Sequence, residues 1–434
     1  MPTRGVAEDT EEHMQANAEI QSVAAERAYS VPLSEIDVSD PKLHQADAIW
    51  PYFSRLRQEA PVHYTPDSDF GAFWSVTRYK DIMNIEMQPK TFSSEAARGG
   101  ITIMDGNEVA TLPMFIAMDP PKHDAQRKVV SPIVAPHNLA KLEDLIRQRT
   151  AERLDELPLN EEFDWVQEVS INLTTKMLAT LFDFPYEDRH LLTHWSDIAT
   201  TLPGAGLIDS EEERMVEVQA CAEYMTRLWN ERVNSEPGPD VLSMLAHSDK
   251  TRNMSPEEFL GNMFLLIVGG NDTTRNSMSG GLLALNQHPG EYEKLAANPE
   301  LVQSSLVPEI IRWQTPLAHM RRTANTDIEF AGEKIRKGDK VIMWYVSGNR
   351  DERSIDRPNE FIVDRQRPRQ HLSFGFGIHR CVGNRLAELQ LRILWEELLQ
   401  RWPDPMQIEV TGQPQRILSN FIKGYESLPV RINA

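Results

Sequence analysis

Cysteine is scarce in this chain, which has only two, Cys221 and Cys381, among 434 residues. Two thiols are too few for a disulfide framework, a zinc ribbon or an iron–sulfur cluster held within one chain. The histidines are scattered, and none forms a zinc-spaced set with further ligands. We expect Cys221 to be a small core residue of a helix. The composition favours a reduced, cytoplasmic protein.

Long apolar runs and basic clusters are missing as well. No run approaches the roughly 20 apolar residues of a membrane-spanning helix, and the first thirty residues have no apolar signal core. The net charge is −20, from 45 Lys and Arg against 65 Asp and Glu. A chain this acidic is a poor partner for nucleic acid or an anionic membrane surface. We therefore expect no membrane anchor and no nucleic-acid partner.

Helical periodicity dominates the middle of the chain, and short β-rich pieces lie toward both ends. Early and late strands must then pair across the helical body, which favours one domain. The pattern predicts a mainly α protein with small β-sheets, a single large domain over 38–434, and a flexible polar N-terminal tail over 1–37. The expected helices are 139–154, 166–181, 211–233, 256–287, 300–313 and 384–402, and the expected strands are 62–64, 73–77, 328–330, 340–346 and 421–432.

The expected helix over 256–287 contains an unusual break in its pattern. It is apolar on most faces, which predicts a central, buried helix, yet Gly269 and Gly270 lie in its middle. Each glycine costs about 1 kcal/mol relative to alanine there. Thr273 falls four residues after Gly269, so its hydroxyl can bond that carbonyl. The glycines leave room for a flat cofactor and a small ligand; the alternative is a close helix-packing contact.

Cys381 lies in a glycine-rich turn, Phe374 to Gly383, directly before the last helical pattern. Such a turn can direct several backbone N–H groups at one sulfur, and the following helix start adds positive dipole character. Both effects favour a thiolate. A single thiolate on a rigid loop suits the axial ligand of a haem iron. The alternative is an inert, buried cysteine.

This turn fits the pattern Phe-x-x-Gly-x-x-x-Cys-x-Gly, and with it the chain resembles the cytochrome P450 family. Residues Gly269 to Thr274 match the family's oxygen-binding motif. The resemblance implies the cytochrome P450 fold and a haem-thiolate monooxygenase with haem b, Cys381 as the iron ligand, and O₂ as cosubstrate. It places Gly269, Phe374 and Gly383 at the cofactor. It also implies that Thr273 holds dioxygen and a water, and that Asp272 relays protons.

The resemblance also implies a structural role for a buried acid–base set. Glu309 and Arg312 lie at i and i+3 on one helix face. In isolation this is a common surface pair, but in the family such a pair locks the core through an arginine in a later loop, which Arg365 fits. Pro308, directly before Glu309, removes an N–H and strains the preceding turn.

Further residues are expected to bind the haem propionates. His123 and Arg127 lie at i and i+4 on a helix that prolines begin, a cationic face that suits carboxylates; the alternative is a solvated helix. By resemblance, Arg322 and His379 complete the set, and the Arg-x-Ala frame favours Arg322 over Arg321.

Substrate contacts are carried over by position in the family fold. They are almost all aliphatic or Met, which favours a flexible apolar chain over a polar or aromatic substrate, although each residue could equally be plain core. The candidates are Ile103, Met104, Leu112, Met114, Leu265, Val268, Leu317, Ala318, Met320 and Phe421.

From Val38 onward the chain resembles one branch, the soluble bacterial alkane terminal hydroxylases, most closely over 114–124, 269–281, 310–317 and 343–351. This implies ω-hydroxylation of medium-chain n-alkanes, with fatty acids or primary alcohols as further substrates. No reductase domain follows Ala434, so we expect electrons from NAD(P)H through a separate ferredoxin reductase and ferredoxin, and a monomeric enzyme.

Three alternatives remain open. One is a fatty-acid or terpenoid hydroxylase of the same fold. Another is a haem carrier or gas sensor, in which Asp272 and Thr273 would have no use. The third is a peroxide-driven peroxygenase, which the same two residues disfavour because they suit O₂ activation.

Overall fold

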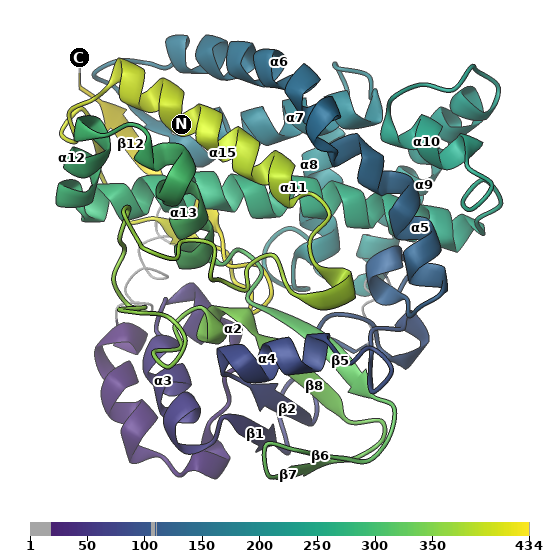
Figure 1. Cartoon of the computed structure of the whole chain (residues 1–434), viewed down its shortest axis with the longest axis vertical. Helices are drawn as coiled ribbons and strands as arrows, with labels where there is room; N and C mark the ends of the chain where they lie inside the picture. The colour runs from purple at the N-terminus through teal and green to yellow at the C-terminus, as the bar shows by residue number, and fades with distance from the viewer. Residues whose placement is uncertain (1–18, 106–108, 110, 434) are drawn as a thin grey trace.

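Helices form most of the molecule, and a small sheet lies at one side of it, in the lower part of Figure 1. The structure is a computed structural model that describes residues 19–105, 109 and 111–433. The prediction of a mainly α, single-domain fold with small sheets is confirmed. The helices are α2 Pro41–Gln45, α3 Trp50–Glu59, α4 Tyr79–Glu86, α5 Lys122–Val130, α6 Pro136–Asp155, α7 Asn172–Phe182, α8 His190–Thr200, α9 Glu211–Val233, α10 Val241–His247, α11 Pro256–Gln287, α12 Pro289–Ala297, α13 Val307–Gln314, α14 Tyr345–Gly348 and α15 Asn384–Arg401.

Strands from the two ends of the chain share sheets, as the sequence predicts. The five-stranded sheet has the order β1-β2-β8-β5-β3, with β2 parallel to β8 and β5 antiparallel to it. In a second sheet, β12 lies between β4 and β9. The strands are β1 Val62–Thr65, β2 Phe73–Val76, β3 Phe92–Ser93, β4 Glu162–Asp164, β5 His319–Ala324, β6 Ile328–Phe330, β7 Glu333–Ile335, β8 Lys340–Trp344, β9 Ile408–Val410, β10 Gln415–Arg416, β11 Tyr425–Ser427 and β12 Pro429–Ile432.

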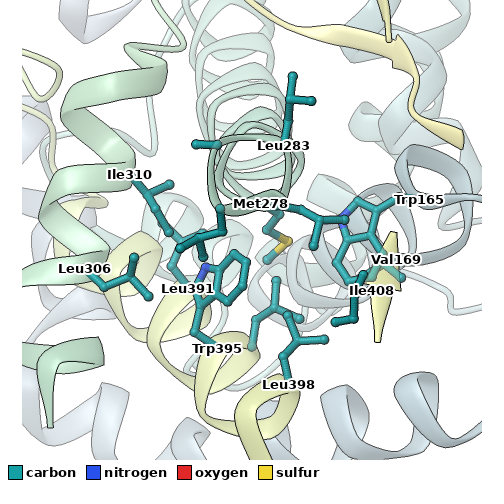
Figure 2. Close-up of a cluster of buried hydrophobic side chains, with 14 of the residues drawn as sticks. Trp165, Val169, Met278, Leu283, Leu306, Ile310, Leu391, Trp395, Leu398 and Ile408 are labelled. Carbon is teal, nitrogen blue, oxygen red and sulfur yellow. The ribbon is translucent and has the colours of Figure 1, made fainter. Parts of the chain in front are cut away.

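Helix α11 is the central element. It begins at Pro256, after Ser255, whose side-chain oxygen accepts from the Glu258 N–H at 3.2 Å, and it ends where the sequence predicts. Figure 2 looks along this helix and shows side chains of α13 and α15 on one side of it and Trp165 on the other. Trp165 and Trp395 are fully buried in this cluster. Apolar side chains of neighbouring elements thus hold the C-terminal half of α11 in place.

Two glycines of α11 allow neighbouring elements to approach closely. A Cβ at Gly270 would lie 2.5 Å from Leu178 Cδ2 in α7, and one at Gly280 would lie 2.1 Å from Gln314 Oε1 in α13. Both distances are too short for non-bonded atoms, so a larger residue would force the side chain of Leu178 or Gln314 to move. Close packing, the alternative considered for the glycine pair, therefore explains Gly270.

Pro308 is accommodated by a change of helix type. It lies in the first turn of α13, and the preceding residues, Val302–Leu306, form a π-helical turn. A proline at the start of a helix has no N–H to lose from the ladder, and the wider turn makes room for its ring. The strain expected from Pro308 is therefore relieved locally.

The described part of the expected N-terminal tail packs on the body. Residues 19–30 are helical, and Ala24 and Ala28, four residues apart, are buried in a cluster with Phe53 and Trp344. The Arg55 guanidinium donates to Ala28 O at 2.7 Å. Small residues thus line the helix face that packs on the body; residues 1–18 of the expected tail lie outside the described residues.

None of the helices that the structure describes combines the length and the apolar composition needed to cross a bilayer.

Candidate functional site

An internal cavity lies between the middle of α11 and the loop that carries Cys381. Its walls also come from β5, from the segments around 101–104 and 114–116, and from the turn at Phe421. Eight of the ten predicted substrate-contact residues line it, namely Ile103, Met104, Met114, Leu265, Val268, Leu317, Met320 and Phe421.

The other two, Leu112 and Ala318, are not among the residues that line this cavity. Leu112 lines a second cavity between α9 and the start of α11, where it packs over Gly261. Ala318 is buried in the cluster that contains Trp344 and Val346. Position in the family fold predicts the segment a residue belongs to, but the side-chain direction depends on local turns of the backbone.

The Cys381 thiol borders the cavity and is open to it. The Cys381 N–H donates to Phe374 O at 2.7 Å, which closes the turn. The backbone N–H groups of Gly383 and Asn384 point at the sulfur, as predicted. A Cβ at Gly377, whose φ is +66°, would lie 2.4 Å from Glu86 O, so glycine is required where this loop passes α4. The loop therefore presents a single sulfur to the cavity.

The ionisation of Cys381 differs from the sequence argument. The thiol is open only to a cavity that the protein encloses, and this burial raises the pKa of Cys381 above its usual range, although the Gly383 N–H and the guanidinium groups of Arg127 and Arg380 act in the opposite direction. The sequence argument left out this desolvation. The thiol therefore keeps its proton unless a further cation binds beside the sulfur, and a metal ion would supply that charge. Within the described residues, no three His, Cys, Asp or Glu side chains gather as a metal site of their own.

Gly269 and Thr273 of α11 form the part of the cavity wall that the sequence marked as a notch. The Thr273 Oγ1–H donates to Gly269 O at 2.9 Å, the bond that their spacing predicts. A Cβ at Gly269 would meet no atom within 4 Å, so this glycine borders open space. With its hydrogen committed to Gly269, the Thr273 oxygen offers its lone pairs to a ligand in the cavity.

Asp272 is fully buried and does not line the cavity. Its carboxylate accepts from Ser196 Oγ at 3.1 Å and from Thr200 Oγ1 at 3.2 Å, and it lies 3.0 Å from Arg275. Burial raises the pKa of Asp272, and Arg275 counteracts part of the shift. Thr200 does line the cavity, so a hydroxyl stands between this carboxylate and the cavity interior.

Basic groups gather at the edge of the cavity near Cys381. Arg127, Arg322 and His379 line it, and the ring centroids of His123 and His379 are 4.4 Å apart. Among the described residues, the buried His123 Nε2 and His379 Nδ1 have no hydrogen-bond partner. Arg321 instead pairs with Asp105 at 2.6 Å. The side chain that faces the cavity is therefore Arg322, as the sequence argument favours.

This combination fits haem. Open space beside Gly269, the thiol of Cys381, and basic groups without partners at the edge match a planar macrocycle with a metal at its centre and carboxylates on its rim. Buried polar atoms without partners are uncommon in native proteins, and carboxylates would satisfy those of His123 and His379. Phe374 and Gly383 also line this cavity.

A buried charge cluster lies behind the Cys381 loop. Glu309 accepts from Arg312 at 2.7 and 2.8 Å and from Arg365 at 2.8 and 3.1 Å, and the Glu309 and Arg312 side chains are completely buried. The structure thus brings together the three residues that the sequence grouped. Arg312 Nη1 also donates to Asn349 O at 3.0 Å. The cluster ties α13 to the segment that leads to the Cys381 loop.

Glu86 and Tyr345 were not identified from the sequence, yet both line the cavity. Tyr345 Oη donates to Glu86 Oε1 at 2.5 Å, and Arg322 Nη2 lies 3.7 Å from the same oxygen. Burial raises the pKa of Glu86 to about 7, although the charge of Arg322 counteracts this. The signal that could have identified Glu86 is an acid in line with the apolar positions Ile82 and Ile85 of the helix Tyr79–Glu86, α4.

Comparison with known proteins supports this geometry. Residues 110–418 match the family model described as "Cytochrome P450". The linalool 8-monooxygenase of Pseudomonas putida is 37% identical over 91% of this chain and 98% of its own length. The methyl-branched lipid omega-hydroxylase of Mycobacterium tuberculosis is 31% identical over 95% of this chain and 99% of its own. The solved structure of cytochrome P450-153 from Novosphingobium aromaticivorans is 46% identical, covers 92% of this chain and 99% of its own, and superposes with a TM-score of 0.85.

Glu309→Gln should destabilise the protein strongly. It removes the charge that Arg312 and Arg365 share, and breaking a buried pair in this way costs about 3–5 kcal/mol. The measurement is the free energy of unfolding from urea titration. Glu360→Gln, on an exposed ion pair with Arg357, is the control and should change it by less than about 1 kcal/mol. Similar losses in the two variants would contradict the role assigned to Glu309.

Glu86→Gln should stabilise the protein at pH 8 and have little effect at pH 5. The folded protein holds the Glu86 proton up to a pKa of about 7, against 4.5 ordinarily. Stability therefore falls as pH rises from about 4.5 to 7, by about 3 kcal/mol in total. Glutamine stays neutral and avoids this loss. The test is the thermal midpoint of unfolding at both pH values, with Glu236→Gln, at an exposed position, as the control. If Glu86→Gln changes the midpoint by the same amount at pH 5 and at pH 8, the raised pKa of Glu86 is contradicted.

Proposed function

The chain belongs to the cytochrome P450 family and is a cytochrome P450 monooxygenase, and on that premise we propose that it hydroxylates the terminal carbon of medium-chain n-alkanes or related aliphatic chains. The related chains include fatty acids and primary alcohols. The observation that carries this proposal is the apolar wall of the cavity beside Gly269 and Thr273.

That wall is built from aliphatic and thioether side chains of separate segments. Leu265 and Val268 come from α11, Leu317 precedes β5, and Met320 lies within β5. Met114 and Phe421 extend the same wall. Such a surface gains from burying methylene groups, about 0.8 kcal/mol for each, and methionines adapt to a flexible chain. A long aliphatic chain suits it better than a polar or rigid substrate.

The relatives give independent support for attack at a chain end. One of them is named a methyl-branched lipid omega-hydroxylase, and its likeness extends over 95% of this chain. The stretches 269–281 and 310–317, which resemble the alkane terminal hydroxylases, contribute Thr273 and Leu317 to the cavity.

When bound, haem supplies the activation of O₂ and the transfer of one oxygen atom to a C–H bond. Thr273 would hold a water or a polar ligand through its free lone pairs, close to where that chemistry occurs. Asp272 would pass protons inward through the hydroxyl of Thr200. Arg275 and the partly exposed Asp197 lie between Asp272 and solvent. A haem carrier or gas sensor would need none of these groups.

Terminal attack requires control of position. A terminal methyl C–H bond is stronger than the neighbouring methylene C–H, so an unguided oxidant attacks inside the chain. Leu317 and Met320 on one side, and Leu265 and Val268 on the other, would admit only the chain end to the reacting position. Placement in the transition state would then outweigh the intrinsic preference.

Electrons would come from NAD(P)H through a ferredoxin reductase and a separate ferredoxin. The docking face would lie around Arg380, which is exposed beside Cys381. The chain as a whole is acidic, with a net charge of −20, so the local positive charge of Arg380 would be needed to orient an acidic partner.

A terpenoid is the second candidate substrate. The relative named linalool 8-monooxygenase, at 37% identity, favours it. The same apolar wall would accept a branched chain, so the cavity lining alone does not separate the two substrates.

Turnover of octane tests the proposal. The protein is incubated with octane, a surrogate ferredoxin system and NADH, and the alcohols are identified by gas chromatography. We expect mostly 1-octanol. Mostly internal alcohols, or no octane oxidation alongside good turnover of linalool, would refute terminal alkane hydroxylation.

Thr273→Ala should keep haem and substrate binding but release peroxide in place of product, because the hydroxyl that holds water in the cavity is lost. Product formed per NADH consumed should fall by at least about tenfold, a lower bound for the loss of a group that aids proton transfer, since such groups contribute about 10²–10⁴-fold. Ser277→Ala, which also removes a hydroxyl from α11 and the cavity lining, is the control. If Thr273→Ala forms as much product per NADH consumed as the unmodified protein, Thr273 does not have the role assigned to it.

Leu317→Ala should move product from 1-octanol toward 2- and 3-octanol without abolishing oxidation. A wider passage lets the chain slide past its terminal carbon, and a loss of about 1.4 kcal/mol of positional preference changes the product ratio tenfold. Leu112→Ala is the matched control, because Leu112 lines the other cavity. If both variants give the same ratio as the unmodified protein, Leu317 does not control position.

A further inference from the structure

Two buried polar side chains hold the segments that flank the substrate cavity. Asn262 lies in the second turn of α11, and His319 is the first residue of β5. Both are almost completely buried, and neither lines the cavity. Each bonds a backbone N–H in the stretch between β3 and α5, whose residues Ile103, Met104 and Met114 form part of the cavity wall.

Asn262 fixes the segment around Phe115 to α11. Its Oδ1 accepts from the Phe115 N–H at 3.0 Å, while its Nδ2 donates to Gln126 Oε1 in α5 and to Glu258 O, each at 2.9 Å. The Asn262 side chain thus connects α11 both to the segment around Phe115 and to α5.

Gly261, the residue before Asn262, allows the same segment to lie directly against α11. A Cβ at Gly261 would lie 2.5 Å from Pro113 O, too close for any residue except glycine without a shift of the backbone. The bond from Asn262 and the absence of a side chain at Gly261 therefore hold the same segment against α11.

His319 fixes two other parts of the wall. The Ile103 N–H lies 3.1 Å from His319 Nε2, and Asn420 O lies 3.0 Å from Nδ1. Because the Ile103 N–H is a donor, Nε2 must accept, and Nδ1 therefore carries the proton given to Asn420 O. Burial lowers the pKa of His319 to about 3, so the ring is neutral and this tautomer persists at physiological pH.

The backbone groups held in this way belong to residues that line the cavity. Ile103, Phe115 and Asn420 all form part of its wall, and Met114 and Phe421 lie next to them in the same wall. The His319 ring also contacts Phe421, with centroids 5.2 Å apart. A buried N–H without its acceptor is unfavourable, so losing either bond would make the backbone move until the N–H finds a new partner. Such a move carries the lining side chains with it.

We propose that Asn262 and His319 are positioning residues that set the shape of the substrate cavity and thereby the carbon atom at which the substrate is oxidised. The part concerning the position of oxidation rests on the proposed function. The part concerning the backbone of the cavity wall stands on the hydrogen bonds alone.

The two ring nitrogens of His319 allow a matched pair of variants. His319→Gln places an amide oxygen near the position of Nε2 and retains an acceptor for Ile103. His319→Asn reaches only the position of Nδ1, so it retains the donor to Asn420 and leaves the Ile103 N–H without its acceptor. Asn262→Leu removes the acceptor of Phe115. Asn286→Leu, which breaks a bond to Ile408 O at the far end of α11, controls for the loss of a partly buried amide of the same helix.

Hydrogen exchange of the holoenzyme, measured by mass spectrometry, tests the backbone. We expect exchange to rise at least tenfold at Ile103 in His319→Asn and at Phe115 in Asn262→Leu, and to stay near the unmodified level in His319→Gln and Asn286→Leu. Unchanged protection in both His319→Asn and Asn262→Leu would overturn the proposal. If Asn262→Leu does not fold, the comparison of His319→Asn with His319→Gln at Ile103 alone tests the proposal.

The octanol ratio from the same proteins tests the consequence for specificity. The ratio of 1-octanol to internal octanols should fall at least threefold in His319→Asn and Asn262→Leu and remain unchanged in His319→Gln and Asn286→Leu. Faster exchange with an unchanged ratio would overturn the role in specificity. If the unmodified protein does not oxidise octane, the proposed function fails separately, and the product ratio from linalool replaces the octanol ratio.

Discussion

The position of Cys381 depends on the buried charge of Glu309. Arg312 and Arg365 neutralise this carboxylate, and Arg312 extends the contact to the backbone of Asn349. The Asn349 side chain then accepts from the Leu372 N–H at 2.6 Å and donates to Ser373 Oγ at 2.9 Å, just before the turn that ends at Cys381. Removing one charge would leave others buried without a partner, which is far more costly than a surface pair. The cluster therefore fixes the loop and, with it, the direction of the sulfur.

Helix α11 forms the wall of the cavity across from Cys381, and its glycines serve two different purposes. Gly270 and Gly280 allow helices to pack closely, whereas Gly269 borders open space and Thr273 bonds its carbonyl. A helix built only for stability would not carry these glycines. Residues with low helix propensity thus occur in α11 where the cavity needs space and a hydroxyl group. Such departures from local sequence rules are expected at functional sites.

Much of this arrangement follows from the sequence because it depends on local spacing. The bounds of α9 and α11, the Thr273–Gly269 bond and the i, i+3 pairing of Glu309 with Arg312 are all set within one or two helical turns. What the sequence could not provide depends on tertiary contacts. The raised pKa of Cys381 results from burial, and Ala318 is buried in the cluster that contains Trp344 and Val346. Glu86 escaped notice because only the fold brings α4 next to Tyr345 and Arg322.

The absorption spectrum of the ferrous protein with carbon monoxide tests most directly whether Cys381 is the haem ligand. Of the two cysteines, Cys381 is the one whose thiol lines the cavity. We predict the band of a thiolate-ligated haem for the unmodified protein and for Cys221→Ala, whose substituted thiol is buried far along the chain in α9. Cys381→Ser should lose that band. A spectrum typical of histidine ligation in the unmodified protein, or an unchanged band in Cys381→Ser, would contradict the account.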